Sequence, residues 1–130
     1  MTLAAQPAPA VGLEHALAGL VAAASPPQGT SSGAWRWQVH RRMGAVRDAL
    51  VAEVGGQSEA WLAARGGTTS RERGTLLARL GTTGAHVLAD GDAPVVRREL
   101  DRLLVDLGRH VQRLHDLAYD EVELELGGSD

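Results

Sequence analysis

The chain has 130 residues, 44% of them hydrophobic, a formal net charge of −3 and no cysteine. This length fits a single domain with one sizeable core, and the hydrophobic content excludes a chain that is disordered throughout. The absence of cysteine excludes disulfides and Cys-ligated zinc, and the negative charge with only three Trp and one Tyr argues against nucleic-acid binding. No run of about 18 apolar residues occurs, so we expect no membrane span and a cytoplasmic location.

All 13 basic residues are arginine, and Phe, Ile, Lys and Asn are absent. The codons of these four missing residue types are AT-rich, so the composition indicates a bacterium with a GC-rich genome. The use of Arg in place of Lys is then a codon effect, and it does not by itself indicate bidentate recognition of a ligand.

The first part of the chain predicts a mobile lead followed by a helix. Residues 1–9 hold small residues and two Pro, and a helix is expected over residues 10–24. Its apolar residues recur at helical spacing, at Leu13, Leu17, Leu20 and Ala24. This stretch also has the apolar character of a secretion signal, which leaves a secreted protein as the alternative. Glu14 and His15 interrupt it and no basic residue precedes it, so we favour the amphipathic helix.

A second helix is expected over residues 34–54, after a loop at 25–33 that holds two Pro and two Gly. The apolar stripe of this helix consists of Val39, Met43, Val46, Leu50 and Val54. The Gly55-Gly56 pair is expected to end or bend it. Ser58 can then cap a short helical segment, which residues 65–67 (Arg-Gly-Gly) are expected to end.

Two further helices are expected in the second half of the chain. One begins at Ser70 as its N-cap, ends at Gly91 and carries the apolar residues Leu76, Leu80 and Val87. Its glycines at 74, 81 and 84 weaken it but permit a close approach of another helix. The other begins at Asp92, with Pro94 in its first turn, and runs to Leu126. Its apolar stripe is Val96, Leu100, Leu103, Leu107, Leu114 and Leu117.

The last residues of this fourth helix also alternate between apolar and acidic from Val122 to Leu126, so a short extended segment is the alternative there. Four amphipathic segments with short connections, and no strand-rich region, predict an all-α, up-down-up-down four-helix bundle over residues 10–126. Residues 127–130 form a short tail.

The histidine at position 110 lies inside the apolar stripe of the fourth helix when its residues are placed at about 100° each. Carboxylates occur near the same line, at Asp106 and at Glu121. A histidine flanked by carboxylates on a core-facing stripe is typical of metal sites in helical bundles, and His40 and His86 could add ligands from the second and third helices. The alternative is a core histidine that forms one hydrogen bond, with Asp106 as the partner at i, i+4 spacing.

The four-helix layout, His110 and the segment HVQRLHDLAYDEVELELGGSD resemble the hemerythrin-like HHE cation-binding bundles. The resemblance implies a bundle in which His110 corresponds to a ligand on the last helix of a non-haem di-iron centre. The HxxxE motif that the family carries on its second helix is absent, because Gly44 stands four residues after His40. The first helix offers only His15. The resemblance therefore implies the family's architecture without a complete di-iron site, so we expect no cofactor, or iron or zinc in the alternative.

Charge is distributed unevenly along the expected bundle. The fourth helix begins with three arginines and ends with five acidic residues, an order opposed to the helix dipole. The second helix starts at the same end of an up-down bundle. One end therefore collects basic residues: Arg36, Arg41, Arg42, Arg97, Arg98 and Arg102. The acidic residues at the other end are Asp116, Asp120, Glu121, Glu123 and Glu125. A solvated surface is one interpretation; docking of an acidic protein, or head-to-tail pairing of copies, is the other.

Trp35 and Trp37 lie about 200° apart at the start of the second helix, so both cannot point inward. One of them is available either to close the end of the bundle or to anchor an interface beside the arginines. No nucleophile motif, phosphate-binding loop or HExxH motif is present, so no catalytic residue is assigned. The sequence thus favours a non-enzymatic bundle of the interaction or accessory type. The alternative is a metal-binding bundle centred on His110, with a role in sensing oxygen or metal.

Overall fold

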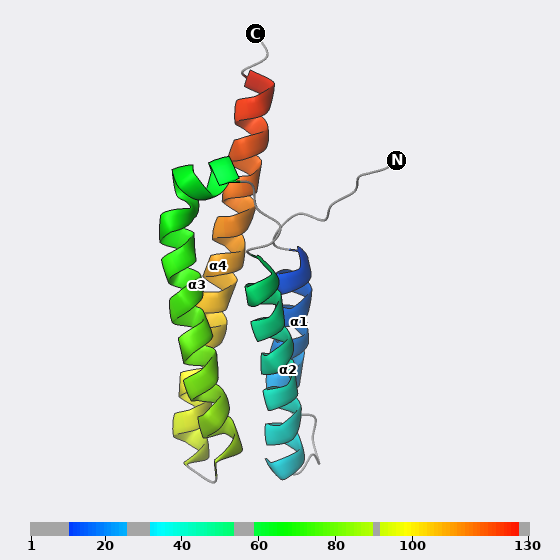
Figure 1. Cartoon of the computed structure of the whole chain (residues 1–130). Helices are drawn as coiled ribbons and strands as arrows, with labels where there is room; N and C mark the ends of the chain where they lie inside the picture. The colour runs from blue at the N-terminus through cyan, green and yellow to red at the C-terminus, as the bar shows by residue number, and fades with distance from the viewer. Residues whose placement is uncertain (1–10, 26–31, 54–58, 90–91, 128–130) are drawn as a thin grey trace.

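The computed structural model of the chain describes residues 11–25, 32–53, 59–89 and 92–127, and within these ranges it describes only the backbone at 59–66, 118 and 120–127. These residues form four helices: α1 (Val11–Ala24), α2 (Ser32–Ala52), α3 (Glu59–Leu88) and α4 (Ala93–Gly127). Successive helices run antiparallel, so α2 and α4 start at the same end (Figure 1). Since α1 and α3 each pack against both α2 and α4, the helices form a closed ring. The predicted all-α four-helix bundle is confirmed.

The described residues of the apolar stripes predicted for the helices form one continuous core, and Val54, also predicted, lies outside the described residues. The buried apolar residues are Leu13, Leu20, Ala24, Val39, Met43, Val46, Leu50, Leu76, Leu80, Val87, Val96, Leu100, Leu103, Leu107, Val111 and Leu114. Leu17 and Leu117, at the edges of their stripes, are half-buried and pack against this core. Burial of these side chains is the main force that holds the helices together, since isolated helices of this length are marginal in water. None of the helices that the structure describes is long and apolar enough to cross a membrane.

The third helix differs most from the prediction. It begins at Glu59 and continues through Gly66 and Gly67, so the break predicted at residues 65–67 is wrong. A glycine inside a helix costs about 1 kcal/mol relative to Ala, whereas a proline costs about 3, so packing against α4 can hold the helix through two glycines. The segment from Val122 to Leu126 is also helical, which excludes the extended alternative. The predicted break at Gly55-Gly56 lies outside the described residues.

The helices differ greatly in length, and this difference positions the site. With a rise of about 1.5 Å per residue, α4 is about 50 Å long and α1 about 20 Å. The final turns of α4 therefore extend beyond α1 and α2 (Figure 1). The end of α2 faces the middle parts of α3 and α4, and this is the level at which polar side chains enter the core.

The opposite end of the bundle is closed by side chains at the start of α2. The indole Nε1 of Trp35 donates to the carbonyl oxygen of Ala24 at 3.2 Å, at the end of α1. The guanidinium of Arg36 donates to the carbonyl oxygens of Val87 (2.9 Å) and Ala89 (2.5 Å), at the end of α3. These contacts satisfy terminal carbonyls that the helices themselves leave without partners.

Candidate functional site

His110 is the one histidine of the described residues that is wholly buried, with 0% of its surface exposed. It lies on α4 between the buried residues Leu107, Val111 and Leu114, so the prediction that it points into the core is confirmed. A polar ring at such a position requires hydrogen-bond partners, since burial without them costs several kcal/mol.

Both ring nitrogens of His110 have a carboxylate partner. Nδ1 lies 2.5 Å from Oε1 of Glu72 on α3. Nε2 lies 3.2 Å from Oε1 and 3.3 Å from Oε2 of Glu53, the residue that directly follows α2. The imidazole therefore joins three segments of the bundle at the level where α2 ends.

Each glutamate is in turn paired with an arginine. A guanidinium nitrogen of Arg73 on α3 lies 3.8 Å from Oε1 of Glu53, and one of Arg113 on α4 lies 2.6 Å from Oε2 of Glu72. The side chain of Glu53 is 1% exposed, whereas that of Glu72 is 25% exposed. We call these five residues the His110 network. In this network the carboxylate of Glu53 is buried, whereas that of Glu72 is partly exposed to solvent.

The surroundings of His110 favour its charged form. Burial by itself lowers the pKa of the imidazole, but the hydrogen bonds and negative charges of Glu53 and Glu72 outweigh burial and raise the pKa above its usual value. The hydrogen bonding agrees, because an ionised carboxylate can only accept, and two accepting partners require two N–H donors. We therefore assign His110 as an imidazolium that donates to both glutamates.

The geometry does not suit a single metal ion. The two glutamates contact nitrogens on opposite edges of the ring, so one ion cannot be ligated by His110 and by both carboxylates. A ligating histidine also needs a nitrogen that carries a lone pair. In the part of the chain that the structure describes, no group of three or more His, Cys, Asp or Glu side chains is arranged to hold a metal ion.

The residue predicted to partner His110 is occupied elsewhere. Asp106 accepts from Arg79 of α3 at 2.6 Å and lies 3.7 Å from Arg109. The prediction that Asp106 hydrogen-bonds His110 is wrong, because Asp106 lies at the edge of the stripe, where the guanidinium of the neighbouring helix reaches it. The side chain of Glu121 lies outside the described residues.

The other two histidines considered as ligands do not approach His110. His86 pairs its Nδ1 with the carboxylate of Glu99 at 2.9 Å. His40 faces Gly84 on α3, at 3.5 Å from the position that a Cβ there would occupy. Glu72 lies 12 residues before Gly84, which is about 18 Å along the helix. The histidines on α2, α3 and α4 therefore do not converge.

The His86–Glu99 pair is a local contact near the turn between α3 and α4. Burial raises the pKa of Glu99, but hydrogen bonds to His86 and Thr83, with the charges of His86 and Arg79, outweigh it and lower the pKa. On the other side of the bundle, Nε2 of His115 lies 2.9 Å from a carboxylate oxygen of Glu14, which links α4 to α1. His15, on α1, is exposed.

The predicted interaction residues fall into two groups. Trp35, Arg36 and Arg97 help to close the end of the bundle; Arg97 lies over the ring of Trp35 at 5.9 Å and also pairs with Asp101. Trp37, by contrast, is 58% exposed. The remaining exposed arginines have no hydrogen bond or ion pair with another described residue: Arg41, Arg42, Arg98 and Arg102.

Sequence reasoning missed Glu53 and Glu72, although both left a signal. Glu53 continues the spacing of the buried residues Val39, Val46 and Leu50, and so extends the buried stripe of α2 by one position. Glu72 stands four residues before Leu76 and eight before Leu80. A charged residue on each of three apolar stripes is the pattern that could have identified the network.

Comparisons with protein families, with curated proteins and with solved structures each find no match for this chain.

Proposed function

We propose that this chain is a non-enzymatic helical bundle that acts by binding another protein, with a hemerythrin-like architecture but without a complete di-iron site. The observation that carries this proposal is that both nitrogens of the buried His110 are occupied by carboxylates. Among the described residues, the titratable groups of the His110 network therefore serve to join helices to one another.

The chemistry of the network supports a structural role. A general base or a metal ligand needs an unprotonated nitrogen, and the negative charges of Glu53 and Glu72 disfavour one here. The carboxylates are engaged by Arg73 and Arg113, so neither is free to serve a substrate. Iron or zinc bound at His110 would require this arrangement to open.

The outer surface supports a binding role. Trp37 is exposed one helical turn before Arg41, which forms no hydrogen bond or ion pair with another described residue. Trp and Arg are the residue types most enriched at the centres of protein interfaces. The basic end suits an acidic protein or the acidic end of a second copy. The composition favours the cytoplasm of a bacterium with a GC-rich genome as the setting. Nucleic acid is a poor partner for a chain with a net charge of −3.

Elemental analysis of untagged protein tests the proposal. We expect iron and zinc far below one equivalent, and an unfolding midpoint that neither added Zn²⁺ nor a chelator shifts, because a ligand stabilises only the state that binds it. Stoichiometric iron or zinc that is lost in His110→Ala would overturn the proposal. That result would favour the alternative of a metal-binding bundle that senses oxygen or metal.

A further inference from the structure

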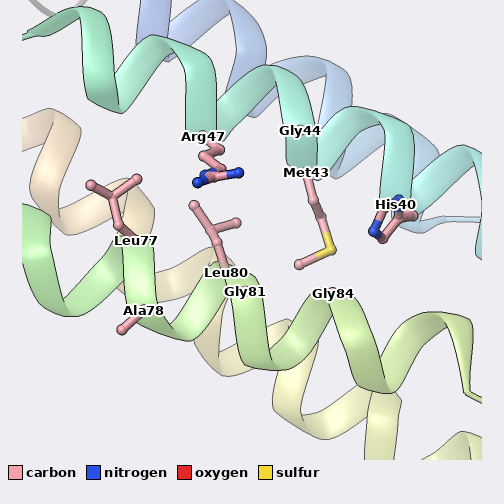
Figure 2. Close-up of a pocket in the computed structure, with 9 residues that line it drawn as sticks. All are labelled: His40, Met43, Gly44, Arg47, Leu77, Ala78, Leu80, Gly81 and Gly84. Atoms are coloured by element: carbon pink, nitrogen blue, oxygen red, sulfur yellow. The ribbon is translucent and has the colours of Figure 1, made fainter.

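A groove runs along the outside of the bundle between α2 and α3, with a volume of about 340 Å³. Figure 2 shows the side chains that line it, from both helices. Its floor is apolar, because Met43 and Leu80 belong to the buried core and Leu77 packs against that core. It lies on the far side of α3 from the His86–Glu99 contact and does not involve the His110 network.

The groove presents two basic side chains that have no polar partner among the residues that the structure describes. His40 and Arg47 both line it from α2, and neither forms a hydrogen bond or ion pair with any described residue. They stand seven residues apart, which is two helical turns, or about 10 Å. The arginines of α3 that approach neighbouring helices behave differently, since Arg73 and Arg79 both have carboxylate partners.

The walls of the groove are open because they carry glycine. A Cβ added at Gly44 of α2 or at Gly81 of α3 would meet nothing within 4 Å. Figure 2 shows Gly44 on α2 and Gly81 on α3, so the two helices that flank the groove each carry one of these glycines. Small residues at such positions let the backbone of an added helix come close, as they do between packed helices.

We propose that this groove binds an acidic amphipathic helix of a partner protein. Charge complementarity selects the occupant: two carboxylates seven residues apart on one face of the partner helix match the spacing of His40 and Arg47. An apolar side chain between the carboxylates then packs on Met43 and Leu80. Arg47 supplies a permanent charge, whereas His40 supplies one only when it is protonated. The inference rests on the proposed function, since it names the surface and the partner class of a binding bundle.

A designed peptide serves as the probe. It has about 18 residues, is stapled to hold the helix, and carries two Glu seven positions apart with Leu between them. We expect binding by fluorescence anisotropy that weakens with added salt. The perturbed amide signals of ¹⁵N-labelled protein should map to the groove. A peptide with Lys in place of both Glu should not bind.

Matched variants of the protein locate the binding. Gly81→Leu fills the groove, whereas Gly74→Leu changes the same helix at another open position that does not line the groove. Both replace a helical glycine by a better helix former, so both should fold. We expect Gly81→Leu to abolish peptide binding and Gly74→Leu to leave it unchanged. Arg47→Gln should weaken binding about tenfold, as for the loss of one close charge pair, while Arg71→Gln should have no effect.

The outcomes separate the two proposals. Equal binding of the Lys peptide, or full binding by Gly81→Leu, would overturn the groove proposal. Perturbed signals confined to Trp37 and Arg41 would also overturn it and would leave the proposed binding function in place. A dimer that Gly81→Leu converts to monomer would show that a second copy occupies the groove, which contradicts a separate partner. If the Glu peptide binds nowhere on the protein, the groove proposal alone is overturned. The proposed function is tested separately, by the metal content of the protein.

Discussion

Substitution of His110 by Leu should destabilise the bundle strongly, even though Leu is the more usual residue at a buried helical position. The change removes the imidazolium and leaves the carboxylate of Glu53, 1% exposed, with only the guanidinium of Arg73 at 3.8 Å. The loss of the imidazolium destabilises Glu72 less, because its carboxylate is partly solvated and still pairs with Arg113 at 2.6 Å. Breaking a buried pair by removing one partner costs about 3–5 kcal/mol, so the loss should fall in this range at neutral pH.

The double variant Glu53→Met/His110→Leu provides the matched control. It removes the unpaired carboxylate together with the imidazolium, and replacing a whole buried ion pair by apolar residues is often neutral or stabilising. The double variant should therefore be more stable than His110→Leu alone. Urea unfolding followed by circular dichroism at pH 7 measures both differences. The reasoning fails if His110→Leu lowers the free energy of unfolding by less than about 0.5 kcal/mol, which is the usual range for a surface substitution. It also fails if the double variant loses as much stability as the single one.

Three further predictions follow from the contacts. The pKa of His110 is raised in the folded state. Its contribution to the free energy of unfolding is therefore complete below the pKa of the unfolded state, near 6.5, and is lost as pH rises through the pKa of the folded state. Stability should then fall by up to about 1.4 kcal/mol per pH unit in that window, and urea unfolding of His110→Gln should lack this part of the slope. Arg36→Gln should cost about 1–3 kcal/mol in the same assay because it leaves terminal carbonyls of α3 without a charged donor, while Arg41→Gln should stay within about 0.5 kcal/mol. An NMR titration should find the pKa of Glu99 below its usual value, and His86→Ala should move it upward; no change in that variant would contradict the assigned cause.

The sequence was sufficient to predict the helices and the sides that they bury. Apolar residues at helical spacing, such as Val39, Val46 and Leu50, indicate directly which side of a helix is buried in the core. The glycines at 66 and 67 were misleading, because they lower the stability of a helix without preventing it. Whether α3 continues through them depends on its packing against α4, which is a tertiary effect that no local pattern contains.

The partners of His110 could not be predicted from one helix at a time. A helical wheel compares residues within a helix, and it favoured Asp106 because that residue lies one turn away. The observed partners, Glu53 and Glu72, come from other segments. Their approach depends on how far each helix is shifted along its neighbours. That shift follows from the packing of the whole core, so the charged residues on the stripes could indicate a buried network but not its pairing.

The central claim is that His110 is a doubly protonated cross-link between helices. The ¹⁵N chemical shifts of its two ring nitrogens in metal-free protein at pH 7 test this claim most directly, with His110→Gln used to assign the signals. We expect both nitrogens to carry a proton and to have similar shifts, and added Zn²⁺ to leave them unchanged. A neutral ring with one lone-pair nitrogen, or a shift that changes when Zn²⁺ is added, would contradict the account.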